Sequence, residues 1–224
     1  MLAHSCKKEK AENEPLNEVA TVIDIDGNSY KTVKIGTQEW MSENLRTTKY
    51  CNGDAIIDAT MDTTWMNLII GAYNTSPGGD EKNLGFFYNW YAANDNRKIA
   101  PAGWHIPTDS DWAKITNFLG GESVAGSKLK DWSIYHWWSG WNPGSTIEGS
   151  FSGAGCGYYG YCIIMGDILP FCQTNYRHLR AYWWSITENN STEALCRYVD
   201  DVYSDIFRSS LSKSAGCSVR CVKD

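Results

Sequence analysis

Residues 19–41 (VATVIDIDGNSYKTVKIGTQEWM) alternate between apolar and polar side chains, which is the period of a strand with one buried face. Asp26-Gly27 interrupts the alternation, and this dipeptide favours a hairpin turn between two strands. The fragment DIDGN (24–28) also resembles part of a calcium-binding loop, but the further oxygen ligands and the distant Glu of such a loop do not follow. The pattern therefore predicts a β-hairpin.

A helical pattern begins after Pro107. Thr108 is suited to be an N-cap, and Asp111 stands three residues later, where it would complete a capping box. Apolar residues then recur at helical spacing, namely Trp112, Ile115, Phe118 and Leu119. Gly120-Gly121 ends the pattern. We expect a short strand at 103–106 and a helix from 109 to about 119.

The rest of the chain carries further strand patterns. Residues 182–188 and 194–211 have strand character, 64–74 fits a short helix or a strand edge, and 85–95 fits a buried strand or a short helix. The stretch 122–180 is rich in Gly, Ser and aromatic residues and predicts a long irregular loop region. We expect the N- and C-terminal strands to pair and to close one α+β domain over residues 21–224. Four tryptophans in these motifs are expected in its core: Trp104, Trp112, Trp183 and Trp184.

Composition narrows the function classes. The chain has 224 residues, a net charge of −6 and a pI of about 5.2. The acidic balance argues against a nucleic-acid partner, because no basic patch is available to meet phosphates. No run of 18 apolar residues occurs, so no segment reads as a transmembrane helix. The 13 Tyr and 11 Trp suit half-wet ligand surfaces as well as cores.

The eight cysteines do not form a metal motif. They contain no C-x-x-C pair, and the four histidines are scattered, so a zinc site is not predicted. Cys217 and Cys221 are four residues apart, which on a strand places both on one face without favouring a bond between them. A cysteine-rich exported protein and a reduced cytosolic chain are both compatible with this usage.

Residues 1–20 read as a flexible leader because they are polar, of mixed charge and interrupted by Pro15. The fragment LAHSC (2–6) resembles the end of a bacterial lipoprotein signal, with Cys6 as the lipidated residue and membrane tether. The alternative is an ordinary disordered leader with a chance cysteine. The first interpretation predicts an exported protein at the cell surface or on the outer membrane.

No catalytic motif is present. The chain lacks a nucleophile elbow, an HExxH motif, a P-loop and a dinucleotide fingerprint. Asp109 and Asp111 sit at a helix start, where acids favour the helix dipole, and Asp200 and Asp201 are expected on opposite faces of a strand. No catalytic residue, cofactor or metal is predicted. Aromatic residues of the long loop could stack on sugar rings or pack the loop down, namely Trp137, Trp138, Trp141, Tyr158, Tyr159 and Tyr161.

Three ordered motifs, GWHIPTDSDW (103–112), YWWSITE (182–188) and SVRCVKD (218–224), accompany the opening DIDGNSYKTVKIGTQEWMSENLRTTKY (24–50). With this opening the chain resembles the Fibrobacter succinogenes major paralogous domain (FISUMP) over residues 21–224. The resemblance implies a single C-type-lectin-like domain with antiparallel sheets, one or two helices, close termini and a long excursion loop. It also implies an exported bacterial protein.

The same fold includes the formylglycine-generating enzyme, which uses a C-terminal cysteine pair to bind copper. SVRCVKD resembles the structural GFRC terminus of that enzyme and not its copper motif. The EPN and WND calcium motifs of sugar-binding lectins are also missing, since WNP at 141–143 lacks the acid. The resemblance therefore implies neither catalysis nor calcium-dependent sugar binding.

The last third of the chain resembles the variable region of proteins that are diversified by retroelements. Such regions are altered at adenines, so their varied positions never become Lys, Glu, Gln, Met or Trp. Residues 194–211 (ALCRYVDDVYSDIFRSSL) contain none of these five. A strand-rich segment also avoids Lys and Glu for reasons of propensity.

These observations favour a non-catalytic, surface-displayed domain that binds an unknown protein or glycan, without an obligate oligomer. The alternatives are an oxidase similar to the formylglycine-generating enzyme and a carbohydrate-binding or structural adhesion module. We expect one set of side chains in 196–211 to pack inward and the other to form an exposed patch, because its Tyr, Asp and Ser content resembles a paratope. The predicted ligand-binding residues are Cys196, Tyr198, Asp200, Asp201, Tyr203, Ser204, Ile206, Phe207, Ser209, Tyr158 and Tyr159.

Overall fold

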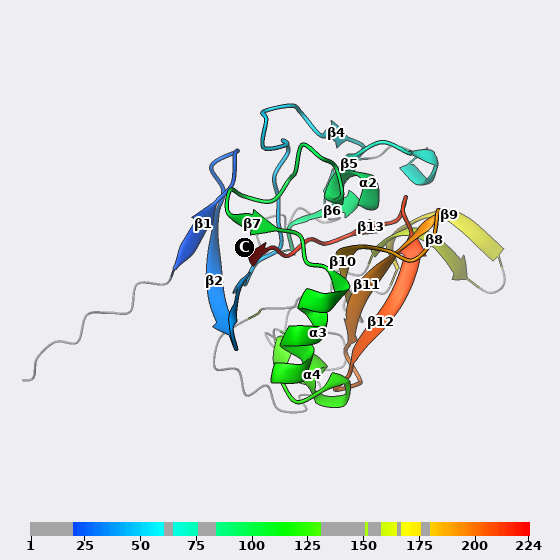
Figure 1. Ribbon diagram of the computed structural model, residues 1–224. Coiled ribbons are helices and arrows are strands. Elements are labelled where there is room, and N and C mark those ends of the chain that lie inside the picture. The colour runs from blue at the N-terminus through cyan, green and yellow to red at the C-terminus, as the bar shows by residue number, and fades with distance from the viewer. Residues whose placement is uncertain are drawn as a thin grey trace, which may run out of the picture.

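The computed structural model describes residues 20–60, 65–75, 84–130, 151 and 180–224, and the backbone of the strands at 158–164 and 167–175. This part of the chain is a mixed α+β structure of three mostly antiparallel sheets and three α-helices (Figure 1). The predicted α+β class is confirmed, but the described residues form three α-helices where one or two were expected. The leader with Cys6, the loop residues Trp137, Trp138 and Trp141, and the side chains of Tyr158, Tyr159 and Tyr161 lie outside the described residues.

The first sheet joins the two ends of the described chain. Across the sheet the order is β1 (Thr21–Ile23), β2 (Ser29–Ile35), β3 (Gln38–Met41), β14 (Val222–Lys223) and β7 (Trp104–His105). β14 is antiparallel to both neighbours, and Val222 lies opposite Trp40 on one side and His105 on the other. The prediction that the N- and C-terminal strands pair is confirmed.

The predicted turn forms between β1 and β2. The Asp24 carboxylate accepts hydrogen bonds from the backbone N–H groups of Asp26 at 3.0 Å and Asn28 at 2.9 Å, and from the Tyr30 hydroxyl at 2.6 Å. Gly27 has a φ of +84°, which a residue without a Cβ adopts at little cost. The polar residues of DIDGN therefore hold the turn together.

The other two sheets contain most of the remaining strands. The second sheet is antiparallel, in the order β10 (Arg180–Glu188), β11 (Glu193–Asp200) and β12 (Ile206–Ser212). The third has the order β4 (Ile57–Asp58), β5 (Ala72–Thr75), β6 (Phe86–Asn89), β13 (Gly216–Cys217), β8 (Tyr158–Ile164) and β9 (Asp167–Asn175). The strands predicted in 182–188 and 194–211 are confirmed, the second as two strands joined at 201–205.

The helices agree with the sequence pattern in one case and depart from it in another. α3 (Asp109–Phe118) starts with the predicted capping box, in which Thr108 and Asp111 bond each other's backbone N–H. α4 (Glu122–Leu129) lies beside α3 along the second sheet (Figure 1). The prediction that 122–180 is irregular was wrong, because this range contains α4, β8 and β9. β8 pairs with β13 and β9, and such tertiary pairing overrides a weak local pattern.

The two ambiguous segments contain both kinds of structure. Residues 64–74 include the 3₁₀ turn η1 (Trp65–Asn67) and the start of β5. Residues 85–95 include β6, followed directly by the short helix α2 (Trp90–Ala93), whose N-cap side chain is Asn89.

Tryptophans fill the core as predicted. Trp112, Trp183 and Trp184 are fully buried, and Trp104 is 7% exposed. Trp112 and Trp183 lie 5.9 Å apart between ring centroids and pack with Trp40 and Phe151. Trp184 belongs to the neighbouring cluster on the other face of the second sheet.

A buried polar cluster, which we call the Asn44 hub, links five distant parts of the chain. The Asn44 carbonyl oxygen accepts hydrogen bonds from Arg220 Nε at 2.6 Å and from Trp183 Nε1 at 3.0 Å. The Asn44 amide donates to the Leu84 carbonyl at 2.7 Å. Arg220 also donates to the Phe151 carbonyl and stacks on the Phe151 ring. The ENL (43–45) and SVRC (218–221) motifs therefore meet at one buried point.

Replacing Asn44 with Ala removes the shared acceptor and leaves the buried Arg220 guanidinium underpaired. We expect a loss of about 3 kcal/mol in the free energy of unfolding, because unsatisfied buried polar groups are costly. Urea unfolding, monitored by tryptophan fluorescence, measures this free energy for the variant and the wild type. The matched control is Asn117→Ala, at an exposed helix position, with a change within about 0.5 kcal/mol. Equal stability of the two variants would contradict a structural role for the hub.

Candidate functional site

Three aromatic rings form a continuous row across the second sheet. We call Tyr182 of β10, Tyr198 of β11 and Phe207 of β12 the aromatic ladder. They occupy directly opposed positions in the register of the three strands. Tyr182 and Tyr198 stack with centroids 4.8 Å apart, and Tyr198 and Phe207 stack at 4.7 Å with only 16° between their planes. Opposed aromatic pairs of this kind stabilise a sheet and fix ring orientation.

Tyr203 continues this row at the outer strand. It is 56% exposed, and its ring stands nearly perpendicular to that of Phe207, at 86° and 6.1 Å. Tyr203 comes from the 201–205 turn, between β11 and β12. The exposure of the rings therefore increases along the row, from Tyr182, which is 4% exposed, to Tyr203.

The C-terminal part of α4 holds the 201–205 turn in place. Ser127 N–H donates to the Ser204 carbonyl at 2.9 Å, and Lys130 Nζ donates to the Tyr203 carbonyl. Gly126 makes a close backbone approach possible, because a Cβ at this position would lie 1.9 Å from the Asp205 carbonyl oxygen. The exposed Tyr203 ring is thus carried by a firmly anchored backbone.

An ion pair lies beside the aromatic ladder at the N-terminal end of β10. Arg180 Nε donates to Asp200 Oδ2 at 2.7 Å, and Arg180 Nη1 donates to the Tyr182 hydroxyl at 3.3 Å. The guanidinium also lies over the Tyr198 ring, 5.1 Å from its centroid. Burial raises the pKa of Tyr182, so this phenol is neutral at physiological pH. The site combines ring surfaces with a fixed cation.

The acidic pair beside the ladder is buried. Asp200 and Asp201 are 6% and 4% exposed. Burial, together with the adjacent Asp200 carboxylate and a hydrogen bond to it, raises the pKa of Asp201. The expectation that these two side chains diverge was wrong. β11 ends at Asp200, so Asp201 is outside the extended strand that would direct it to the opposite face.

Lys130 faces this acidic pair. The residue is fully buried, and burial lowers the pKa of its ammonium to about 8, although Asp200, Asp201 and Asp205 favour the charged form. The cluster lies beneath the turn that carries Tyr203, so its charge state bears on how that turn is held.

The predicted site residues of 196–211 fall into an exposed or half-buried group and a buried group. Tyr198, Ser204, Phe207 and Ser209 are half-buried, and Tyr203 is exposed. Cys196, Asp200, Asp201 and Ile206 were expected at the surface, and this was wrong. Cys196 packs with Trp184 in one core cluster, while Ile206 packs with α3 and α4 residues in the other. Both faces of β11 are covered, so one continuously exposed set over 196–211 does not form.

The structure adds two residues that the sequence argument missed, Arg180 and Tyr182. Both belong to β10, where Arg180, Tyr182 and Trp184 alternate with Ala181 and Trp183. The period of two was visible in the sequence. Their partners across the sheet were not, because cross-strand register depends on tertiary pairing.

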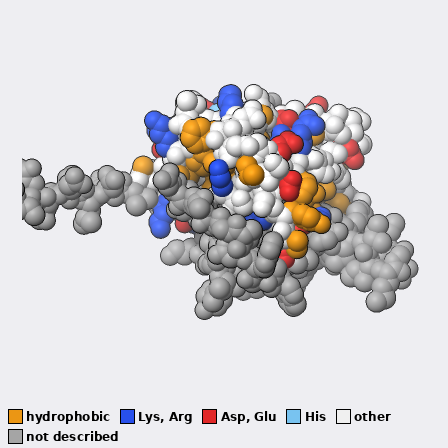
Figure 2. Space-filling view, turned by 90° about the horizontal axis from the view of Figure 1, so that it is seen from below, with side chains coloured by type: hydrophobic (Ala, Val, Ile, Leu, Met, Phe, Trp, Pro, Cys, Tyr) orange, Lys and Arg blue, Asp and Glu red, His pale blue; other side chains and the backbone are white. Residues whose placement is uncertain are grey.

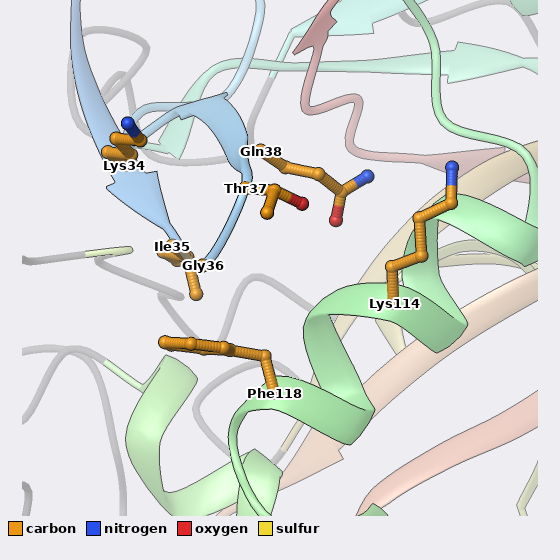
Figure 3. Close-up of a pocket in the computed structure, with 7 residues that line it drawn as sticks. All are labelled: Lys34, Ile35, Gly36, Thr37, Gln38, Lys114 and Phe118. Carbon is orange, nitrogen blue, oxygen red and sulfur yellow. The ribbon is translucent and has the colours of Figure 1, made fainter.

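A separate groove lies between the β2–β3 turn and α3 (Figure 3). It is lined by Lys34, Ile35, Gly36, Thr37, Gln38, Lys114 and Phe118, and the Phe118 ring lies against Gly36. Lys114 and Gln38 already bond the Asp111 carboxylate, at 3.1 and 3.3 Å. Their polar groups are therefore engaged within the protein, and we assign no ligand to this groove.

Exposed apolar side chains alone do not locate a binding site. On the face seen in Figure 2, the described hydrophobic side chains lie in small groups among charged ones. The residues 20–60, 65–75, 84–130 and 180–224 contain no cluster of His, Cys, Asp and Glu that could hold a metal ion. No helix in the described part of the chain is long and apolar enough to cross a membrane.

Comparison with known families gives one match. The family model of the Fibrobacter succinogenes major domain matches residues 33–223. The chain belongs to this family. The match includes the Asn44 hub, the aromatic ladder and Tyr203. Searches of curated proteins and of solved structures gave no significant match.

The buried Lys130 gives the domain a specific pH dependence. Between about pH 8 and 10.5 the unfolded chain binds a proton at this side chain that the folded chain does not, so stability should rise with pH. We expect the unfolding free energy of the wild type, minus that of Lys130→Met, to increase by about 1–3 kcal/mol over this range. Urea unfolding of both chains measures the difference, and the subtraction cancels titrations of Tyr and Cys. A flat difference would contradict a neutralised Lys130.

Proposed function

We propose that this domain is a non-catalytic ligand-binding module and that the aromatic ladder with Tyr203 is its binding surface. The observation that carries the proposal is a row of four contacting rings that ends in the exposed Tyr203. Tyrosine offers a large contact area at a low cost in conformational entropy. Since α4 holds the Tyr203 backbone and Arg180 orients Tyr198, little further order has to be gained on binding.

We also propose that the fold is a form of the C-type-lectin-like fold and that Cys6 anchors the domain to the surface of a bacterial cell. The return of β14 to the N-terminal sheet supports the first part, since close termini are a property of that fold. The LAHSC motif supports the second.

Diversification by a retroelement forms part of the same proposal. It is supported by the missing Lys, Glu, Gln, Met and Trp in 194–211 and by the position of Tyr198, Tyr203 and Phe207 at one surface. Sequencing the neighbouring DNA tests it. We expect a near-copy of the 3′ end of the gene, differing only at adenines, beside a reverse transcriptase gene. The lack of such a copy would contradict diversification by a retroelement. The proposal of a binding surface would then stand separately and would still be tested by the variants below.

The binding surface is tested with Tyr203→Ala. We expect panning of a random-peptide phage library and screening of a glycan array on the wild type to yield binders of one class, which the variant binds at least about tenfold more weakly. The melting temperature should change little, because Tyr203 is exposed. Phe118→Ala, which removes an exposed ring outside the ladder, is the matched control. If both variants bind like the wild type, the ladder is scaffold. Enrichment of glycans alone would favour the carbohydrate-binding alternative.

The oxidase alternative requires accessible cysteines near the C-terminus. Cys217 and Cys221 are fully buried, and burial raises the pKa of the Cys221 thiol. A buried neutral thiol is a poor nucleophile and a poor metal ligand. These properties favour the binding module over the oxidase.

This argument predicts a pattern of thiol reactivity. In the folded domain, iodoacetamide should leave Cys196, Cys217 and Cys221 unmodified, and it should modify all three after unfolding in urea. Burial raises the pKa of Cys196 to about 12, which adds to its protection. Peptide mapping by mass spectrometry gives the result for each residue. Fast modification of Cys217 or Cys221 in the folded state would instead favour the oxidase.

A further inference from the structure

No strand in the described part of the chain pairs with the outer edge of the second sheet. β12 is the last strand in the order β10-β11-β12 and is seven residues long. Among the outermost strands of the other sheets, β1, β4 and β7 have only two or three residues, and β9 has nine. Proteins usually shorten or cover such edges, because unpaired backbone groups attract other strands.

The register identifies which groups of β12 point outward. Lys213 N–H donates to the Thr192 carbonyl at 2.9 Å, so these two residues lie at a hydrogen-bonded position of the β11–β12 register. In an antiparallel pair such residues alternate with non-bonded ones. Phe207, Ser209 and Leu211 therefore bond β11, whereas the backbone groups of Arg208 and Ser210 point away from it. No residue in the described part of the chain bonds these outward groups.

The side chains at this edge are complementary to a particular kind of strand. Phe207 carries the aromatic ladder to the edge on one face. On the opposite face lie Arg208 and its cross-strand neighbour Arg197. Both bond Asp109, Arg208 through Nε at 2.9 Å, and the Arg208 side chain is 51% exposed. An added acidic side chain opposite Arg208 would pair with its remaining guanidinium N–H groups.

We propose that β12 binds an extended segment of a partner protein as an additional strand. This inference rests on the proposed function and specifies the ligand as a peptide. Adjacent residues of a strand point to opposite faces, so the segment carries an aromatic residue opposite Phe207 next to an acidic residue opposite Arg208. The aromatic residue packs against the rings of Phe207 and Tyr203, and the backbone bonds Arg208 and Ser210. Main-chain pairing supplies affinity, and the two side chains supply specificity.

Ser210→Pro tests the backbone part. Proline removes the outward N–H of residue 210 and leaves the hydrogen bonds of β12 to β11, and it is tolerated at strand edges. The probe is a short fluorescent peptide with adjacent Tyr and Glu among Thr and Val residues. Anisotropy titration should show binding to the wild type and at least about tenfold weaker binding to Ser210→Pro. Ser210→Ala is the matched control and should bind like the wild type. In hydrogen exchange, the peptide should protect the amides of Arg208 and Ser210.

Arg208→Glu tests the side-chain part. This variant should reject the Tyr-Glu peptide and bind one in which Lys replaces Glu, a reversal that loss of folding cannot produce. If Tyr203→Ala loses binding and Ser210→Pro binds fully, strand addition at β12 is overturned. The proposed function of the aromatic ladder as a binding surface would then still hold. No binding and no amide protection with either peptide would overturn the inference. Self-association that Ser210→Pro abolishes would assign the edge to a second copy of the chain and also overturn it.

Discussion

The domain is organised around one buried cation, Arg220, whose N–H groups all need hydrogen-bond acceptors. Arg220 is 1% exposed, and a guanidinium in a core is tolerated only when its N–H groups are bonded. Asn44 and the carbonyls of Met41 and Phe151 accept these bonds. Met41 and Asn44 belong to one segment at the end of β3, whereas Phe151 is far from both along the chain, so the charge can be buried only when these segments and the C-terminal segment have assembled. Because Arg220 needs these hydrogen-bond acceptors, it favours the one arrangement of the chain that supplies them.

The hub also determines where the candidate binding surface lies. Trp183, which shares the Asn44 oxygen, belongs to β10 and alternates with Tyr182 of the aromatic ladder. Ser218, two residues before Arg220, exchanges backbone hydrogen bonds with Tyr182 and Trp184. The C-terminal motif therefore fixes β10 from its inner edge, while β11 and β12 extend outward from it. The surface combines a rigid inner side with an outer side that meets solvent.

This division explains why buried charges lie so close to an exposed ring. Lys130 and Asp200 are buried beside the 201–205 turn, to which Asp201 belongs, and the attraction of Lys130 to the two carboxylates offsets part of the cost of burial. The turn consequently holds Tyr203 without a hydrophobic core of its own. If sequence diversity is selected at this surface, it acts on side chains such as Tyr203 and Phe207, whereas the groups below them are constrained by the need for partners.

The sequence alone determined the features that depend on neighbours along the chain. The turn at Asp26-Gly27, the capping box of Thr108 and the burial of the motif tryptophans follow from local hydrogen bonding and periodicity. The pairing of the N- and C-terminal strands, also predicted, followed from strand patterns at both ends. Only the tertiary structure decided that Cys196 and Ile206 are buried, that Arg180 and Tyr182 complete the site, and that β8 and β9 are strands. A strand pattern shows that a residue faces one side or the other, but helices α3 and α4 and the cross-strand register decide what covers each side.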